Sequence, residues 1–115
     1  PDAQTLPPDA EFDRQWALTV LDRTLAILAA EMEQDNKTPL FEVLAPFLTG
    51  GSEYGALEAA APGLGLSPAA LRVAIHRLRQ RYRDLLREQL AQTLGPGASV
   101  EEELAALRMA LRTPV

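Results

Sequence analysis

The chain contains no cysteine. This absence excludes disulfide bonds, thiolate metal ligands and a cysteine nucleophile. It also fits a protein that works in a reducing compartment, and we therefore expect a cytoplasmic location. Apolar residues make up 47% of the chain and charged residues 23%, which is the composition of a folded globular domain.

Groups suited to catalysis are also scarce. His76 is the only histidine, and the sequence has no Gly-rich phosphate loop or nucleophile motif. The acidic run at residues 101–103 cannot converge on one metal ion, because successive residues of a helix point about 100° apart. We therefore predict a protein that is not an enzyme and that has no cofactor and no metal site.

Long apolar segments are missing as well. No apolar run approaches the roughly 20 residues that span a bilayer, and the start has no basic segment followed by an apolar one. We therefore expect a soluble protein that does not bind membranes. Because the sequence begins at Pro1 and not at a methionine, we also expect it to be a piece of a longer chain. Its length of 115 residues suits one small helical domain.

Charge is distributed unevenly along the chain, whose net charge is −5. Residues 67–87 hold six arginines and one aspartate, a balance of +5, whereas the rest holds five basic and fifteen acidic residues, a balance of −10. A cationic segment on an anionic body is typical of a protein with a local anionic partner. DNA is the partner that we expect.

The spacing of apolar residues predicts an all-α fold, a small helical domain of about five helices. The predicted helices cover residues 12–35, 39–48, 53–61 and 68–92, followed by a last helix through Leu111. Their predicted caps are Thr38, Ser52, Ser67 and Ser99. We expect Pro46 to end the regular part of the second helix early, and Pro62-Gly63 to stop the third. No stretch alternates in the manner of a strand.

These helices predict a simple organisation along the chain. We expect a disordered linker at residues 1–11, an N-terminal helical segment at 12–50, a helix-turn-helix at 51–92 and a C-terminal helix at 93–115. Trp16 and the leucines of the first helix are expected in the core. Tyr54 could stack on a partner, but its place near a helix start favours packing.

The fourth predicted helix carries two different stripes. Leu71, Ile75, Leu78 and Tyr82 follow helical spacing and predict a packed side. The basic stripe beside it contains Arg72, His76, Arg79 and Arg83. A short helix, a Gly-containing turn and a capped basic helix together describe a helix-turn-helix, whose second helix enters the DNA major groove. Alternatively, the basic side is merely solvated or paired with acidic helices, and His76 is an exposed bystander.

The segment Leu64-Gly-Leu-Ser-Pro-Ala-Ala-Leu-Arg-Val-Ala-Ile-His-Arg-Leu-Arg-Gln-Arg-Tyr-Arg-Asp-Leu-Leu-Arg87 resembles the fourth conserved region of the extracytoplasmic-function sigma factors. A leucine-glycine pair and a cap precede a helix with a small residue, an aliphatic one and a basic one, as at Ala70-Leu71-Arg72. A run of arginines follows. The stretches 12–18, 87–93 and 102–104 also resemble the flanks of one sigma-like subgroup.

This resemblance implies a winged-helix-like sigma region four. In that family the region recognises the promoter element near position minus thirty-five and docks on the beta flap of RNA polymerase, and an anti-sigma protein is a further partner. Carried over by position, Arg72, Val73 and Ala74 face the groove, while Arg77 and Arg79 lie nearer phosphates. The predicted DNA-binding residues are Ser67, Arg72, Val73, His76, Arg77, Arg79, Arg81 and Arg83.

The sequence also allows two other hypotheses. The helical domain could be a protein-protein interaction or regulatory module that has lost DNA readout, with its acidic and apolar faces binding polymerase, an anti-sigma partner or a missing half of the chain. The leucine-rich first helix could also form a homodimer. An enzyme or a metalloprotein would need a polar cleft that these residues do not predict.

Overall fold

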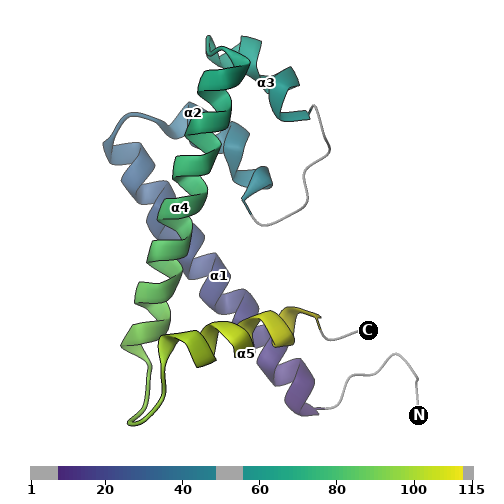
Figure 1. The fold of residues 1–115 in the computed structure, drawn as a ribbon, viewed down its shortest axis with the longest axis vertical. Coiled ribbons are helices and arrows are strands. Elements are labelled where there is room, and N and C mark those ends of the chain that lie inside the picture. Colours follow the sequence, from purple (N-terminus) through teal and green to yellow (C-terminus); the bar gives the residue numbers. More distant parts are fainter. Residues whose placement is uncertain (1–7, 49–55, 113–115) are drawn as a thin grey trace, which may run out of the picture. The chain divides into compact units, whose positions relative to one another are not determined.

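The computed structural model describes residues 8–48 and 56–112, and this part of the chain is helical (Figure 1). The elements are α1 (Pro8–Gln34), α2 (Thr38–Leu44), the 3-10 helix η1 (Ala45–Phe47), α3 (Ala56–Leu64), α4 (Pro68–Gln92) and α5 (Val100–Arg112). The predicted all-α class is therefore confirmed for the described residues. They contain no strand, so nothing in them corresponds to the β-wing of a winged helix.

The first helix begins earlier than its apolar pattern predicted. It starts at Pro8, inside the linker expected at residues 1–11, and ends at Gln34. The predicted break follows directly, since Asn36 has a φ of 58° and the backbone N–H of Lys37 donates to the Met32 carbonyl at 2.8 Å. Asparagine tolerates this left-handed conformation better than most residues. None of the described helices combines the length and the apolar character that a membrane-spanning helix needs.

The second helix differs from its prediction at the start and agrees at the end. Lys37 occupies the N-cap position without a side-chain hydrogen bond, and the predicted cap Thr38 is already the first helical residue. The prediction of a Thr38 cap was therefore wrong by one residue. The regular α-helix ends at Leu44 and continues as the 3-10 helix η1, which contains Pro46. This confirms the early end predicted from Pro46, whose ring and missing N–H disfavour an α-helix interior.

The third helix does not stop where the sequence predicted. It runs from Ala56 to Leu64, so Pro62 and Gly63 lie within it, and the predicted cap Ser52 is outside the described residues. Pro62 lies in the last turn of α3. Its missing N–H therefore removes only one hydrogen bond, close to the end of the helix. The actual end comes at Gly65, which has a φ of 71° and donates its N–H to the Pro62 carbonyl at 3.3 Å.

The last two helices begin at their predicted caps. The Ser67 hydroxyl oxygen accepts a hydrogen bond from the Ala70 N–H at 3.1 Å, and Ser99 accepts one from the Glu102 N–H at the same distance. Each bond satisfies one of the free N–H groups at a helix start, which stabilises the helix by about 1 kcal/mol. α4 covers residues 68–92 as predicted.

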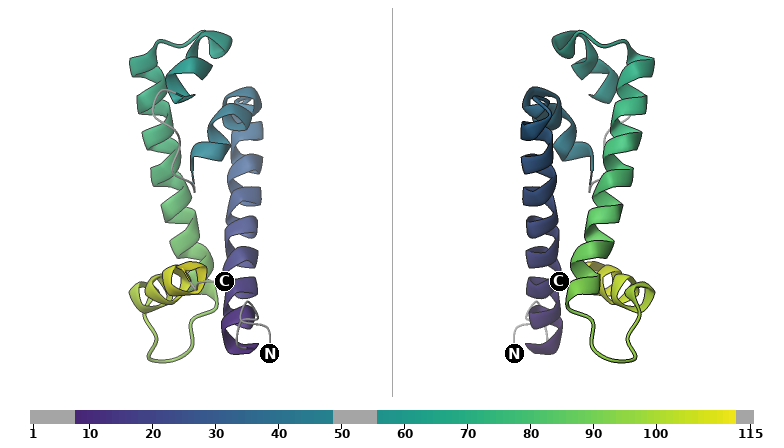
Figure 2. Two further views of the ribbon diagram at one scale, coloured as in Figure 1. Left: turned by 90° about the vertical axis from the view of Figure 1, so that its right-hand side faces the viewer. Right: turned by 90° about the vertical axis from the view of Figure 1, so that its left-hand side faces the viewer.

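The described residues divide into two compact units, and α1 and α4 contribute to both. Unit 1 contains the described residues up to Leu25 and from Leu85 onward. In it, α5 lies against the start of α1 and the end of α4 (Figures 1 and 2). Its buried cluster consists of Ala17, Leu86, Leu90, Leu104, Leu107 and Ala110, with Trp16, Val20, Leu21, Val100 and Leu111 packed around it. The expected core position of Trp16 is thus confirmed, whereas Leu18 is 38% exposed.

Unit 2 contains the described residues between Ala26 and Asp84. Here α2 packs against η1 and α3. The unit's largest fully buried side chains are Leu28, Leu44 and Leu71, from α1, α2 and α4. Burying a leucine side chain stabilises a fold by about 1.5–3 kcal/mol, so each of these three residues stabilises the packing of its helix.

Candidate nucleic-acid interface

The connection between α3 and α4 is short and geometrically defined. Only residues 65–67 separate the two helices. Gly65 adopts the left-handed backbone conformation, which residues with a Cβ rarely adopt. Ser67 then caps the start of α4. The Leu71 N–H also donates to the Ser67 carbonyl at 2.9 Å, so the first turn of α4 is closed. These hydrogen bonds define the conformation of the turn and of the first turn of α4.

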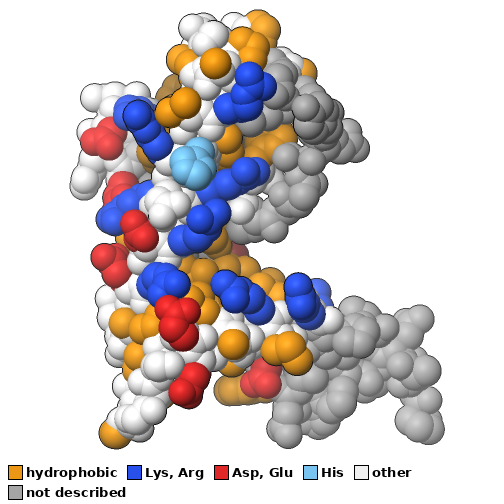
Figure 3. Space-filling view, in the orientation of Figure 1, with side chains coloured by type: hydrophobic (Ala, Val, Ile, Leu, Met, Phe, Trp, Pro, Cys, Tyr) orange, Lys and Arg blue, Asp and Glu red, His pale blue; other side chains and the backbone are white. Residues whose placement is uncertain are grey.

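One side of α4 in unit 2 is buried and the other faces solvent. Leu71, Ile75, Leu78 and Tyr82 are buried, which confirms the predicted packed side. The exposed residues of the helix in this unit include Arg72, Val73, His76, Arg77, Gln80 and Arg83. Figure 3 shows Lys and Arg side chains and the histidine gathered over α4. Arg72 to Arg83 span about 16 Å along the helix axis at 1.5 Å per residue.

Arg79 does not lie on this exposed side. It is half-buried, and its Nε and Nη2 groups donate to the Phe47 carbonyl at 3.2 and 2.9 Å. This carbonyl belongs to the last residue of η1, where a helix end leaves acceptors without helical partners. Arg79 therefore caps η1 and fixes it to α4. Arg79 was predicted to lie near phosphate, because a contact with a residue 32 positions away has no local sequence signal.

Arg81 pairs with an acid of α1. Its Nε and Nη2 groups donate to the two carboxylate oxygens of Glu31 at 2.9 and 2.7 Å, a bidentate arrangement. The side chains of Arg81 and Glu31 are 44% and 35% exposed. The hydrogen bond from Arg81 lowers the pKa of Glu31 below its ordinary value of 4.5, and the charge of Arg81 adds to this while partial desolvation opposes it. Arg81 therefore links α4 to α1.

The other arginines of this half of α4, and His76, are more accessible. Arg83 donates to the side-chain oxygen of Gln80 at 3.3 Å, which keeps it on the exposed side of its own helix. Within the described residues, His76 and Arg77 make no ion pair or side-chain hydrogen bond. Arg72 is exposed as well. These four side chains form the basic surface, a term used below for Arg72, His76, Arg77 and Arg83.

Further along α4, an arginine belongs to unit 1 and serves another role. Arg87 forms an ion pair with Glu101 of α5, and both side chains are largely exposed. This pair joins α4 to the acidic first turn of α5. The acidic run at 101–103 therefore contributes to a contact between helices, in addition to its favourable position at the positive end of the α5 dipole.

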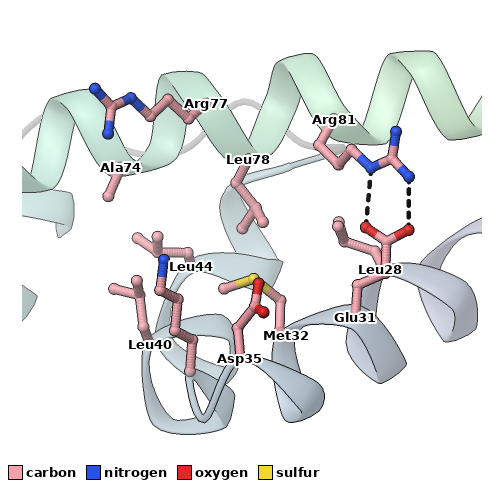
Figure 4. Close-up of a pocket in the computed structure, with 11 residues that line it drawn as sticks. Leu28, Glu31, Met32, Asp35, Leu40, Leu44, Ala74, Arg77, Leu78 and Arg81 are labelled. Carbon is pink, nitrogen blue, oxygen red and sulfur yellow. Dashed lines mark hydrogen bonds and ion pairs between the residues drawn. The ribbon is translucent and has the colours of Figure 1, made fainter.

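A cavity of about 370 Å³ lies beside the basic surface in unit 2, between α1, α2 and α4. Figure 4 shows Leu78 pointing into it from α4, while the Arg77 side chain extends along that helix. The apolar wall also contains Leu28, Met32, Leu40, Leu44 and Ala74. The charged part of the wall consists of Glu31, Asp35, Lys37, Arg77 and Arg81. Because both signs of charge meet at this rim, the cavity does not extend the basic surface.

The described residues offer little else for chemistry. They contain no group of three His, Asp or Glu side chains close enough to hold a metal ion. Two predicted features, the Ser52 cap and the Tyr54 side chain, lie outside the described residues. The arrangement is thus suited to binding an anion through exposed arginines on a braced helix.

Of the predicted DNA-binding residues, the structure leaves Ser67, Arg72, Val73, His76, Arg77 and Arg83 exposed. Arg79 is half-buried against η1, and Arg81 is exposed but pairs with Glu31. No known protein family, curated protein or solved structure matches the chain.

Proposed function

We propose that α3, residues 65–67 and α4 form a helix-turn-helix that binds DNA, with the first turns of α4 in the major groove. One observation carries this proposal: Arg72, Val73, His76 and Arg77 are exposed within the first three turns of a helix that a Gly-containing turn joins to α3. In helix-turn-helix proteins these first turns of the second helix contact the base edges.

The accessible cations support phosphate contact. Arg77 and Arg83 lie six residues apart on α4, and the free N–H groups at the helix start add positive potential. Since the chain as a whole carries −5, binding depends on this local concentration of charge. We expect a dissociation constant of about 10⁻⁴–10⁻⁶ M for mixed-sequence duplex at physiological salt, because only a few phosphates are neutralised.

The resemblance to region four of the extracytoplasmic-function sigma factors makes this proposal more specific. It points to the promoter element near position minus thirty-five as the DNA and to the beta flap of RNA polymerase as a protein partner. An anti-sigma protein is a further partner of that kind. In this proposal the chain binds promoter DNA, and promoter melting requires a different region.

A second candidate is a regulatory helical module without DNA readout. The contacts of Arg79 and Arg81 favour it, because they remove two of the predicted cations from any DNA surface. The two candidates differ in one measurable property, which is affinity for duplex DNA at low salt.

Fluorescence anisotropy of a labelled duplex tests the proposal. We expect saturable binding at 50 mM salt and a linear fall of log affinity with log salt concentration. Replacing Arg77 and Arg83 with alanine should reduce the magnitude of that slope by about 0.9 for each lost phosphate contact. Arg108→Ala with Arg112→Ala removes the same charge from exposed positions of α5 and should leave the slope nearly unchanged. No binding at low salt, or equal losses in both double variants, would overturn the proposal.

A further inference from the structure

Val73 is an apolar side chain in an unusual position. Among the described residues, the large apolar side chains that are well exposed are Phe12, Leu18, Val73 and Met109. Of these four, only Val73 lies on α4. Its exposed fraction is 49%. Isolated exposed valines are common on protein surfaces, so exposure alone does not identify a contact. The position of Val73 relative to the basic surface is what distinguishes it.

The helix geometry places Val73 beside two side chains of the basic surface. His76 and Arg77 follow it at three and four residues, and Ala69 and Ala70 precede it at the same intervals. Residues at these spacings are neighbours on a helix surface. Because the two alanines are small and exposed, they leave the γ-methyl groups of Val73 accessible from the N-terminal side of α4. Val73 is thus an apolar point within a polar and cationic surface.

We infer that Val73 is a specificity-determining residue that reads the C5-methyl group of a thymine in the major groove. This inference rests on the proposed DNA binding and names the base feature that the site recognises. Valine has no donor or acceptor on its side chain, so it cannot take part in hydrogen-bonded readout. The thymine methyl is the apolar group that a base edge presents in the major groove, and small apolar side chains contact it.

The test removes one methyl group from the DNA. Binding-site selection from duplexes with a randomised centre, using the whole chain, identifies positions where thymine is enriched. Each such thymine is then replaced singly by uracil, which keeps the same hydrogen-bonding groups and lacks only the methyl. At one position we expect this replacement to weaken binding about fourfold, the effect of removing one methyl from a buried apolar contact.

Three protein variants assign that effect to Val73. In Val73→Ala, uracil and thymine duplexes should bind within about 1.5-fold of each other, since the residual contact surface is small. Val73→Thr retains a γ-methyl and should keep most of the preference for thymine. Leu18→Ala is the matched control, because it truncates an exposed apolar residue of α1, and it should keep the full preference.

The outcomes distinguish the role of Val73 from the proposed DNA binding. DNA binding without any thymine-to-uracil effect, or with an equal effect in Val73→Ala, would overturn the role of Val73 and leave the proposed function standing. Failure to bind any duplex at low salt would overturn the proposed function, and the role of Val73 with it. Circular dichroism of Val73→Ala should match that of the parent chain, because alanine has the higher helix propensity.

Discussion

Unit 1 and unit 2 are stabilised by different kinds of contact, although α1 and α4 contribute to both. Unit 1 is centred on leucine and alanine side chains from three helices, and its ion pair between Arg87 and Glu101 lies at the surface. Unit 2 also buries leucines, but two arginines of α4 extend to η1 and α1. The arginines of α4 are therefore not equivalent, since some bind neighbouring elements and others are accessible to a partner.

The largest effect should come from the apolar cluster of unit 1. Leu90 is 1% exposed within it. We expect Leu90→Ala to lower the free energy of unfolding by about 2–5 kcal/mol, because it removes buried apolar surface and leaves a cavity. Urea denaturation followed by circular dichroism measures this change. Leu18→Ala at a partly exposed site of α1 is the control and should cost well under half as much; similar losses would mean that the cluster does not dominate unit 1.

Arg79 tests the corresponding polar contact of unit 2. Arg79→Ala removes two hydrogen bonds from a charged donor to the Phe47 carbonyl, and we expect a loss of about 1.5–3 kcal/mol. Arg79→Lys keeps the charge and can restore one of the bonds, so it should recover part of the stability. Amide hydrogen exchange at residues 38–47 should accelerate in the alanine variant. Unchanged exchange there would contradict the capping role of Arg79.

The glycines near the end of α3 provide a matched pair with opposite expected signs. Gly65 has a φ of 71° and Gly63 does not lie in the left-handed region, while a Cβ added at either would meet no atom within 4 Å. Gly65→Ala should therefore cost about 1–2 kcal/mol through backbone strain alone. Gly63→Ala should stabilise the helix by about 0.5–1 kcal/mol. Thermal unfolding of the two variants measures the difference, and equal shifts in Tm would show that Gly65 is not the residue that ends α3.

These residues also explain how far the sequence predicts the structure. The bounds of α4 were predicted correctly because its start carries the local signals Ser67 and Pro68, and its apolar spacing continues to the end of the helix. The end of α3 was wrong because two neighbouring signals compete there. Pro62-Gly63 is a strong breaker on average, but the left-handed conformation of Gly65 ends this helix, and nothing in the local sequence ranks the two.

The sequence predicted which residues of α4 form its basic side, but not which of its arginines contact other helices. Helical spacing identified the basic and buried sides of α4, because periodicity is a local property. The partners of Arg79 and Arg81 lie 32 and 50 residues away along the chain. Such pairings depend on how the helices pack in three dimensions, and the spacing of arginines within α4 does not encode them. The sequence therefore predicted a larger cationic surface than the fold presents.

The smallest expected effect concerns the pair between Glu31 and Arg81. Because both side chains are more than a third exposed, we expect Glu31→Gln to cost at most about 1 kcal/mol at pH 7. The pKa of Glu31 is lower in the folded chain than its ordinary value of 4.5, so the pair stabilises the fold fully above that value. This contribution is lost as the pH falls through the lowered pKa. The unfolding free energies of the parent chain and Glu31→Gln should therefore converge in acid, and differ less in 0.5 M salt than at low ionic strength.

Glu33→Gln, at an exposed acid of the same helix, should show neither trend. A difference between parent and Glu31→Gln that persists unchanged at pH 3 would mean that Glu31 stabilises unit 2 through its shape and not through its charge.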